Sequence, residues 1–178
     1  ETAADLTSRC TLTATVKSTL FRLTDGKLKT PFESVKGKDT SITITAPKGE
    51  KLAALYIVWP SGLTAVNLEL WDETTGDWTL YGQCGIKGFS HETVRFPASD
   101  AVRLHAPDGT YVLPVCELQA FGEGDLPAEV QDWQPSPEKA DLLLLIAHPD
   151  DEYIFFGGLL PTYAGERGRH VAVCYMTY

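Results

Sequence analysis

The sequence is poor in positive charge and has no long apolar run, and each absence excludes a class of protein. Its 15 Lys and Arg residues are outnumbered by 24 Asp and Glu residues, which gives a net charge of −9 and a pI near 4.8. Proteins that bind nucleic acids or anionic membranes normally carry a basic surface, so we expect neither partner. An apolar run such as LLLLIA at 142–147 is far shorter than the roughly 20 residues of a membrane-spanning helix.

Cysteine is also scarce, and no two cysteines form a CxxC pair among Cys10, Cys84, Cys116 and Cys174. This excludes the zinc-ribbon and thioredoxin-type motifs. Cys10 and Cys116 lie near the two ends of the expected first domain, so a disulfide between them in a secreted protein and four free thiols are both open. Cys174, within VAVCYMT, is expected to be a small core residue.

What the chain does contain is typical of globular domains with a core, because 43% of its residues are hydrophobic and 22% are charged. The charge is uneven: residues 119–141 hold six acidic residues and one lysine, together with three prolines. Such a shift in composition indicates a linker, in which Trp133 would dock on a surface. We therefore expect a first domain at 1–120, an acidic linker at 121–140 and a second domain at 141–178.

The first domain is expected to be a β-sandwich. Apolar and polar residues alternate in 11–17, 41–46 and 65–71, which is the pattern of half-buried strands. The more continuous apolar run at 51–59 indicates a central strand. Further strands are expected at 92–96, 101–105 and 111–121, with Gly-containing turns between the strands. Seven or eight short strands without a helical period predict a mainly β fold, an antiparallel β-sandwich.

Three short motifs resemble the discoidin, or coagulation factor 5/8 C-type, galactose-binding-like domain, a jelly-roll sandwich. They are LTDGKLKTPFES at 23–34, WDETTGDW at 71–78 and VCELQAFG at 115–122. The resemblance implies a structural calcium ion held by Asp25, Thr30 and Glu117, because calcium prefers hard oxygen ligands. Ordinary roles in a turn and an edge strand account for the same three residues.

The same resemblance implies glycan binding by aromatic side chains of loops, because sugar faces stack on aromatic rings. The candidates in loop-like stretches are Trp78, Tyr81, Phe89 and His91. Aromatic residues of a sandwich belong to its core more often than to a binding site. The absence of a methionine before Glu1, together with this resemblance, favours a processed protein that is secreted or attached to the cell surface.

Residues 141–178 have a different pattern, that of an incomplete α/β, Rossmann-like βαβ unit. The run DLLLLIA at 141–147 suits a strand that is buried on both faces of a parallel sheet, and 170–177 suits a second one. A helix is expected between them, at 158–167. His148, Asp150 and Asp151 follow the first strand, at the edge where α/β sheets bind ligands. An imidazole and a carboxylate so close in sequence can share one zinc ion, and a second carboxylate can take a proton from water.

This segment resembles the N-terminal part of the PIG-L/LmbE family of zinc-dependent N-acetylglucosaminyl deacetylases, on the residues LLLLIAHPDDE, FFGG and VAVCYMT. The resemblance implies that His148 and Asp151 are zinc ligands, that Asp150 is the general base and that Glu152 supports the loop. The alternative is that Asp150 and Asp151 only cap a helix.

The third zinc ligand of that family is a histidine of a later segment, and this sequence offers no substitute. His170 would lie at the opposite end of its strand, and His91 and His105 belong to the sandwich. We therefore expect the chain to be a truncated deacetylase that is inactive alone. Residues 142–178 would pair with the rest of the enzyme or a second copy, or be poorly ordered.

Two functions are left open by the sequence. In the first, the parent protein hydrolyses N-acetyl groups of amino-sugar glycans, and the sandwich holds it near them. In the second, the chain is a non-catalytic carbohydrate-binding or interaction module.

Overall fold

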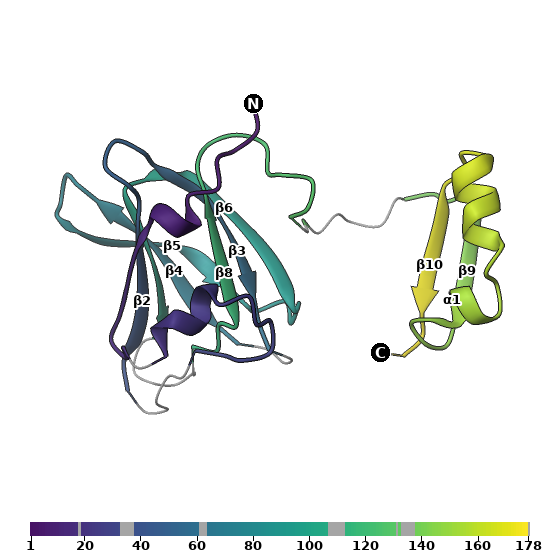
Figure 1. Cartoon of the computed structure of the whole chain (residues 1–178), viewed down its shortest axis with the longest axis horizontal. Coiled ribbons are helices and arrows are strands. Elements are labelled where there is room, and N and C mark those ends of the chain that lie inside the picture. Colours follow the sequence, from purple (N-terminus) through teal and green to yellow (C-terminus); the bar gives the residue numbers. More distant parts are fainter. Residues whose placement is uncertain are drawn as a thin grey trace. The chain divides into compact units, whose positions relative to one another are not determined.

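The computed structural model describes residues 1–17, 19–32, 38–60, 64–106, 113–130, 132 and 138–177. The chain forms two compact units, Glu1–Trp133 and Gln134–Tyr178, which we call the sandwich unit and the C-terminal unit (Figure 1). Trp133, which was expected to dock the acidic stretch, lies outside the described residues. No helix of the described part is long and apolar enough to cross a membrane.

The sandwich unit consists of two antiparallel sheets (Figure 1). The strand order in the five-stranded sheet is β1 (Thr11–Ala14), β2 (Thr40–Thr45), β7 (Ala101–Ala106), β4 (Val66–Asp72) and β5 (Asp77–Cys84). The strand order in the three-stranded sheet is β6 (His91–Ser99), β3 (Leu52–Val58) and β8 (Glu117–Phe121). Two short 3₁₀ helices, η1 (Thr7–Arg9) and η2 (Leu20–Thr24), flank β1. The antiparallel, mainly β fold predicted from alternation is confirmed.

The core forms between the two sheets because alternate residues of each strand are apolar. Ile42 and Ile44 of β2 are fully buried, whereas Thr43 between them and Thr45 after them are not. Leu55 and Ile57 of β3 join the same cluster from the other sheet. Full burial of one such side chain stabilises the fold by about 1.5–3 kcal/mol, so these strands are held firmly in register.

Strand β3 is the central strand of its sheet, as its continuous apolar run predicted. Its second face is covered as well: Ala54 packs against Ala3 and Phe121, with Leu126 and Val130 at the edge of this cluster. The first part of the acidic stretch therefore packs against the sandwich. The N-terminus runs beside it, since Thr2 forms a β-bridge with Asp125.

The C-terminal unit is a pair of parallel strands, β9 (Leu142–Ile146) and β10 (Val171–Tyr175), joined through two helical segments (Figure 1). These are the four-residue helix α1 (Asp151–Ile154) and the π-helical turn η4 (Pro161–Glu166). The strand–helix–strand order was predicted, but the helical segment at 158–167 is short and wound as a π-helix.

The prediction that β9 is buried on both faces is wrong. Leu144 and Ile146 are buried, whereas Leu143 and Leu145 are each 59% exposed. Cys174 pairs with Leu145 across the strands and is exposed on the same open face. The expectation that Cys174 is a core residue is therefore wrong, because only one side of this two-stranded sheet is covered.

All four cysteines are free, so the alternative of a Cys10–Cys116 disulfide is not realised. Cys84 and Cys116 are buried and Cys10 is half-buried. Burial raises the pKa of the Cys10 thiol to about 11. Since the thiolate is the reactive form, this cysteine is protected chemically as well as sterically.

We expect a thiol-specific reagent to modify Cys174 rapidly in the native protein and Cys10 slowly. Cys84 and Cys116 should react only after unfolding. Spectrophotometric thiol titration measures this, and Cys174→Ser should remove the fast phase without affecting the slow one. Rapid modification of a second thiol in the native protein would contradict the assigned burial.

Candidate functional site

The register of the three-stranded sheet brings candidate residues together at one end of the sandwich. Val58, the last residue of β3, pairs with His91 on one side and with Glu117 on the other. A predicted glycan-binding residue and a predicted calcium ligand therefore lie near the same strand end. We call this the His91 end.

A cavity of about 490 Å³ lies at the His91 end, and Leu28, Lys29, Val58, Trp59, Pro60, Ser90 and His91 line it. The Tyr56 hydroxyl forms a hydrogen bond with Nδ1 of His91, and the two rings lie 5.7 Å apart between centroids. Burial raises the pKa of Tyr56, so the hydroxyl stays protonated. Because Nδ1 has this partner, Nε2 is the nitrogen through which His91 would bind a ligand.

The wall of the cavity is fixed by a buried carboxylate. Trp59 is only 2% exposed, and its indole Nε1 donates to Oε2 of Glu92 at 2.9 Å. The same oxygen accepts the backbone N–H of Gly85 at 2.7 Å. Gly85 has a φ of +77°, and a Cβ there would lie 2.4 Å from Cγ2 of Thr64. Only glycine therefore fits at the start of the loop that leads to Phe89.

Phe89 is the one glycan candidate that lies in a loop, between β5 and β6. Its ring is half-buried, and the Lys87 ammonium is 6.0 Å from the ring centroid. His91 follows two residues later, as the first residue of β6. Phe89 and His91 therefore lie close together because they are only two residues apart in the sequence.

Trp78 and Tyr81 lie on strand β5, so their prediction as loop residues is wrong. Trp78 packs edge-on against Trp71, with ring centroids 5.3 Å apart, and the Arg103 guanidinium is 4.7 Å from its ring centroid. Alternation did not reveal β5 because both faces of this edge strand are largely exposed.

Arg103 and its neighbours form a charged network on the outer face of the five-stranded sheet. Glu69 is 8% exposed and pairs with both Arg103 and His105. The other ring nitrogen of His105 is 3.0 Å from Oδ1 of Asp39. Both ring nitrogens of His105 therefore have partners, and this side chain belongs to the charged network on the sheet.

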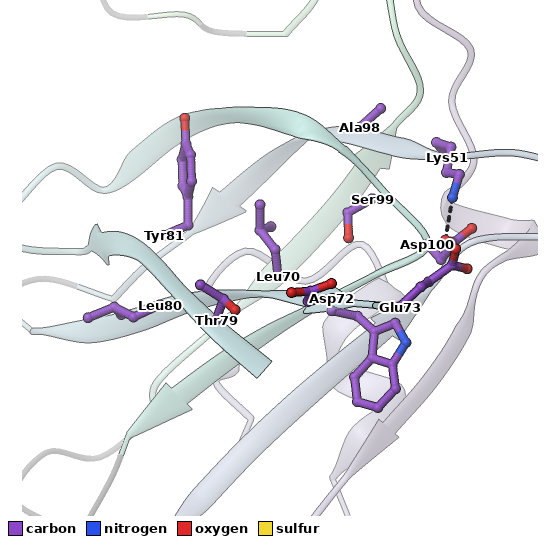
Figure 2. Close-up of a pocket in the computed structure, with 11 residues that line it drawn as sticks. Lys51, Leu70, Asp72, Glu73, Thr79, Leu80, Tyr81, Ala98, Ser99 and Asp100 are labelled. Carbon is purple, nitrogen blue, oxygen red and sulfur yellow. Dashed lines mark hydrogen bonds and ion pairs between the residues drawn. The ribbon is translucent and has the colours of Figure 1, made fainter. Parts of the chain in front are cut away.

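Tyr81 lines a second cavity, of about 390 Å³, at the other end of β3 (Figure 2). Lys51 forms an ion pair with Asp100 there and lowers the pKa of that carboxyl. Glu73 shares a hydrogen bond with Asp100, which raises the pKa of Glu73. Sequence reasoning did not find this cluster, because its members come from three separate turns. The four glycan candidates therefore do not form one site.

The three calcium candidates are only partly brought together. Oε2 of Glu117 accepts the Gly26 N–H at 3.0 Å, and burial, followed by the nearby charge of Asp25, raises the pKa of Glu117. The Thr30 hydroxyl instead donates to the carbonyl oxygen of Lys27 at 3.2 Å. Within the described residues, no three His, Cys, Asp or Glu side chains are grouped closely enough to hold a metal ion.

The motif His148–Glu152 lies directly after β9, at the carboxyl end of the strand. Oδ2 of Asp151 accepts the His148 backbone N–H at 3.0 Å and lies 3.8 Å from Nδ1 of the imidazole. Two ligands of one tetrahedral zinc ion are about 3.3 Å apart, so these two side chains are close to that spacing. His170 lies at the opposite end of the strand pair, where its carbonyl accepts the Asp141 N–H.

No family model and no curated protein matches the sequence, but solved structures do match. One is a family 32 carbohydrate-binding module of Clostridium perfringens NanJ in complex with galactose, with 15% identity and a TM-score of 0.53 over 67% of this chain and 98% of that chain.

A second Clostridium perfringens module, CpGH89CBM32-5 in complex with GalNAc-β-1,3-galactose, is 19% identical, with a TM-score of 0.53 over 66% of this chain and 99% of that one. A chitosan-binding module of a Paenibacillus chitosanase/glucanase is 17% identical, with the same TM-score over 67% of this chain and 99% of its own. The sandwich unit has the fold of a family 32 carbohydrate-binding module.

This fold confirms the galactose-binding-like resemblance of the first domain. The likeness extends over about two thirds of the chain and almost all of each module. The deacetylase resemblance of residues 141–178 rests on the sequence motif alone.

We expect Glu117→Gln to stabilise the protein at neutral pH in the absence of divalent cations. The raised pKa of Glu117 means that the folded state binds the proton more tightly than the unfolded state. The charged carboxylate therefore costs stability above its folded pKa, and this cost disappears as pH falls below the unfolded value. The glutamine keeps an oxygen for the Gly26 N–H.

Urea denaturation at several pH values measures this difference. The midpoint of the variant should exceed that of the wild type at neutral pH, and the two should converge near about pH 3, below the ordinary pKa of glutamate. A variant that is less stable at neutral pH would contradict the assigned environment.

Proposed function

We propose that the sandwich unit is a carbohydrate-binding module that holds a glycan at the His91 end. The observation that carries this proposal is the cavity of about 490 Å³ beside His91, within the usual volume range of small-ligand pockets. The fold supports it, because modules of the same fold bind galactose, GalNAc-β-1,3-galactose and chitosan.

The side chains around the cavity match the chemistry of a sugar. Nε2 of His91, the Ser90 hydroxyl and the Lys29 ammonium can form hydrogen bonds with sugar hydroxyls. Leu28 and Pro60 offer apolar surface to the C–H groups of the ring. A site of a few polar groups on an apolar wall is typical of small-molecule recognition.

Trp78 is less suited to stack on a sugar. The guanidinium of Arg103 covers one face of its ring, and Trp71 contacts its edge. A sugar would have to displace the cation–π contact with Arg103, which is itself paired with the buried Glu69.

We expect His91→Ala to abolish most of the glycan binding, because it removes the hydrogen-bonding edge of the cavity. Phe89→Ala should weaken binding by about tenfold, the loss of about one aromatic contact. Phe21→Ala, which removes an aromatic ring that is 63% exposed and lines another cavity, is the matched control.

A glycan array identifies the ligand, and isothermal titration of that ligand measures the variants. Unchanged affinity in His91→Ala, with loss in a Trp78→Ala variant that is still folded, would refute the assigned end of the sandwich.

A second proposed function concerns the C-terminal unit. We infer that it belongs to a zinc-dependent deacetylase that hydrolyses N-acetyl groups of amino-sugar glycans. The observation that favours it is the 3.8 Å spacing between Nδ1 of His148 and Oδ2 of Asp151 at the strand end. His148 and Asp151 would hold the ion, and the Asp150 carboxylate would accept a proton from water.

Zinc would supply a Lewis acid that polarises the amide carbonyl of the substrate. Catalytic zinc sites in proteins normally have three protein ligands, and two candidates are present here. Inactivity of the chain alone, and pairing with further deacetylase polypeptide or a second copy, therefore stay predictions.

We expect the full chain with Cys174→Ser, which removes the exposed thiol, to bind Co²⁺ or Zn²⁺ weakly through His148. His148→Ala should remove this binding because it deletes one of two ligands, whereas His170→Ala, at the other end of the same strand pair, should preserve it. Isothermal titration with each metal measures the change. Equal metal binding by Cys174→Ser with and without His148→Ala would count against the assignment.

We also propose that the sandwich unit holds a structural calcium ion and that the protein is secreted. Asp25 and Glu117 would share the ion, because a bound cation would offset the burial and the nearby Asp25 charge that raise the pKa of Glu117. Calcium should then reverse the effect of Glu117→Gln at neutral pH from stabilising to destabilising. A glycan partner outside the cell fits the secreted location expected from the sequence.

A further inference from the structure

Glu152 is a buried carboxylate that the proposed metal site does not use as a ligand. It is 7% exposed, and each of its oxygens has a partner. Oε2 accepts the backbone N–H of Asp150 at 3.1 Å, and Oε1 accepts the hydroxyl of Tyr175 at 3.0 Å. A buried carboxylate with two donors is a rigid bridge between them.

The first partner, Asp150, has an unusual backbone. Its φ is +134° and its ψ is −21°, and it is the one non-glycine residue of the described part with a positive φ. Such a conformation is costly for a residue with a side chain and persists only where neighbouring contacts enforce it. The carbonyl of Asp150 accepts the N–H groups of Tyr153 and Ile154 at 2.9 and 3.1 Å. Glu152 fixes the N–H of the same residue, Asp150, through the hydrogen bond to Oε2.

The second partner, Tyr175, is placed by the parallel register. It pairs with Ile146, the last residue of β9. Beyond it, the N–H groups of Met176 and Thr177 donate to the carbonyls of Ile146 and Ala147, each at 2.9 Å. The end of β10 is thereby fixed beside the first residues of the loop, and the Tyr175 hydroxyl reaches Glu152 from a neighbouring strand.

We propose that Tyr175 is a positioning residue of the candidate metal site, because its hydroxyl fixes Glu152 and Glu152 holds the strained backbone of Asp150. The proposal rests on the second proposed function, since Asp150 lies between the two candidate ligands. It gives a role to a residue of β10 outside the HPDDE motif.

The backbone of Asp150 determines how the two candidate ligands are placed. The φ of Asp150 sets the direction of its own carboxylate and the path of the chain from His148 to Asp151. If Glu152 turned away, the strained conformation would relax and the two ligands would lose their spacing. Partners that orient metal ligands through hydrogen bonds typically change metal affinity by about 10–100-fold when they are removed.

The experiment uses the full chain with Cys174→Ser, because the exposed thiol would itself bind cobalt. Tyr175→Phe removes only the hydroxyl. Tyr153→Phe is the matched control, since Tyr153 lies on α1 and is 73% exposed. The first readout is the hydrogen-exchange rate of the Asp150 amide without metal, by NMR. The second is a Co²⁺ titration followed by the visible absorption of the bound ion.

In Tyr175→Phe we expect faster exchange at Asp150 and a Co²⁺ dissociation constant raised by about tenfold, with an unchanged circular dichroism spectrum. Tyr153→Phe should change neither value. Wild-type exchange and wild-type Co²⁺ affinity in Tyr175→Phe would overturn the proposal. A lower melting temperature with unchanged Co²⁺ affinity would also overturn it, because the role would then be structural.

The two proposals fail in different ways. If the wild type shows no Co²⁺ absorption that depends on His148, the metal site fails, and the exchange rate of Asp150 alone decides whether Tyr175 fixes the loop. If Tyr175→Phe does not fold, Glu152→Ala decides, because it removes both acceptors of the bridge. Faster exchange at the Asp150 amide supports the hydrogen-bonded bridge, and wild-type exchange overturns it.

Discussion

The hydrogen-bond register between strands decides which side chains of this protein can act together. In the sandwich unit, Val58 pairs with His91 and with Glu117, which sets the candidate glycan cavity at one strand end. In the C-terminal unit, Tyr175 pairs with Ile146, which sets its hydroxyl beside the His148–Glu152 loop. A slip of one residue would turn each of these side chains to the other face of its sheet, and the buried apolar residues prevent such a slip.

If both proposals hold, one unit would supply glycan recognition and the other would supply chemistry. Small glycan sites are shallow and gain affinity slowly with contact area. A module that holds a glycan beside a tethered deacetylase would raise the local concentration of substrate at the metal site. In this account the net charge of −9 contributes little to recognition, because hydrogen bonds and apolar contacts at the His91 end carry the binding of a sugar.

The sequence predicted the sandwich well because β2, β3 and β7 alternate between one buried and one exposed face, or are apolar throughout. It did not predict β5, whose two faces are both largely exposed, and so it assigned Trp78 and Tyr81 to loops. The His148–Asp151 pair was predictable because its members are three residues apart. The cluster of Lys51, Glu73 and Asp100 was not, since the turns that carry these residues are distant in sequence, and neither was the contact of Tyr175 with Glu152, which depends on register.

We propose above that a glycan binds at the His91 end of the sandwich. The indole N–H of Trp59 reports on that end directly, because it donates to Glu92 behind the cavity wall, whereas Trp71 and Trp78 report on the outer face of the five-stranded sheet. A glycan titration of ¹⁵N-labelled protein, followed by NMR, separates these resonances. We predict that the Trp59 indole signal shifts with saturation while those of Trp71 and Trp78 stay in place. Shifts confined to Trp71 and Trp78 would mean that the glycan binds on the outer face of the five-stranded sheet instead.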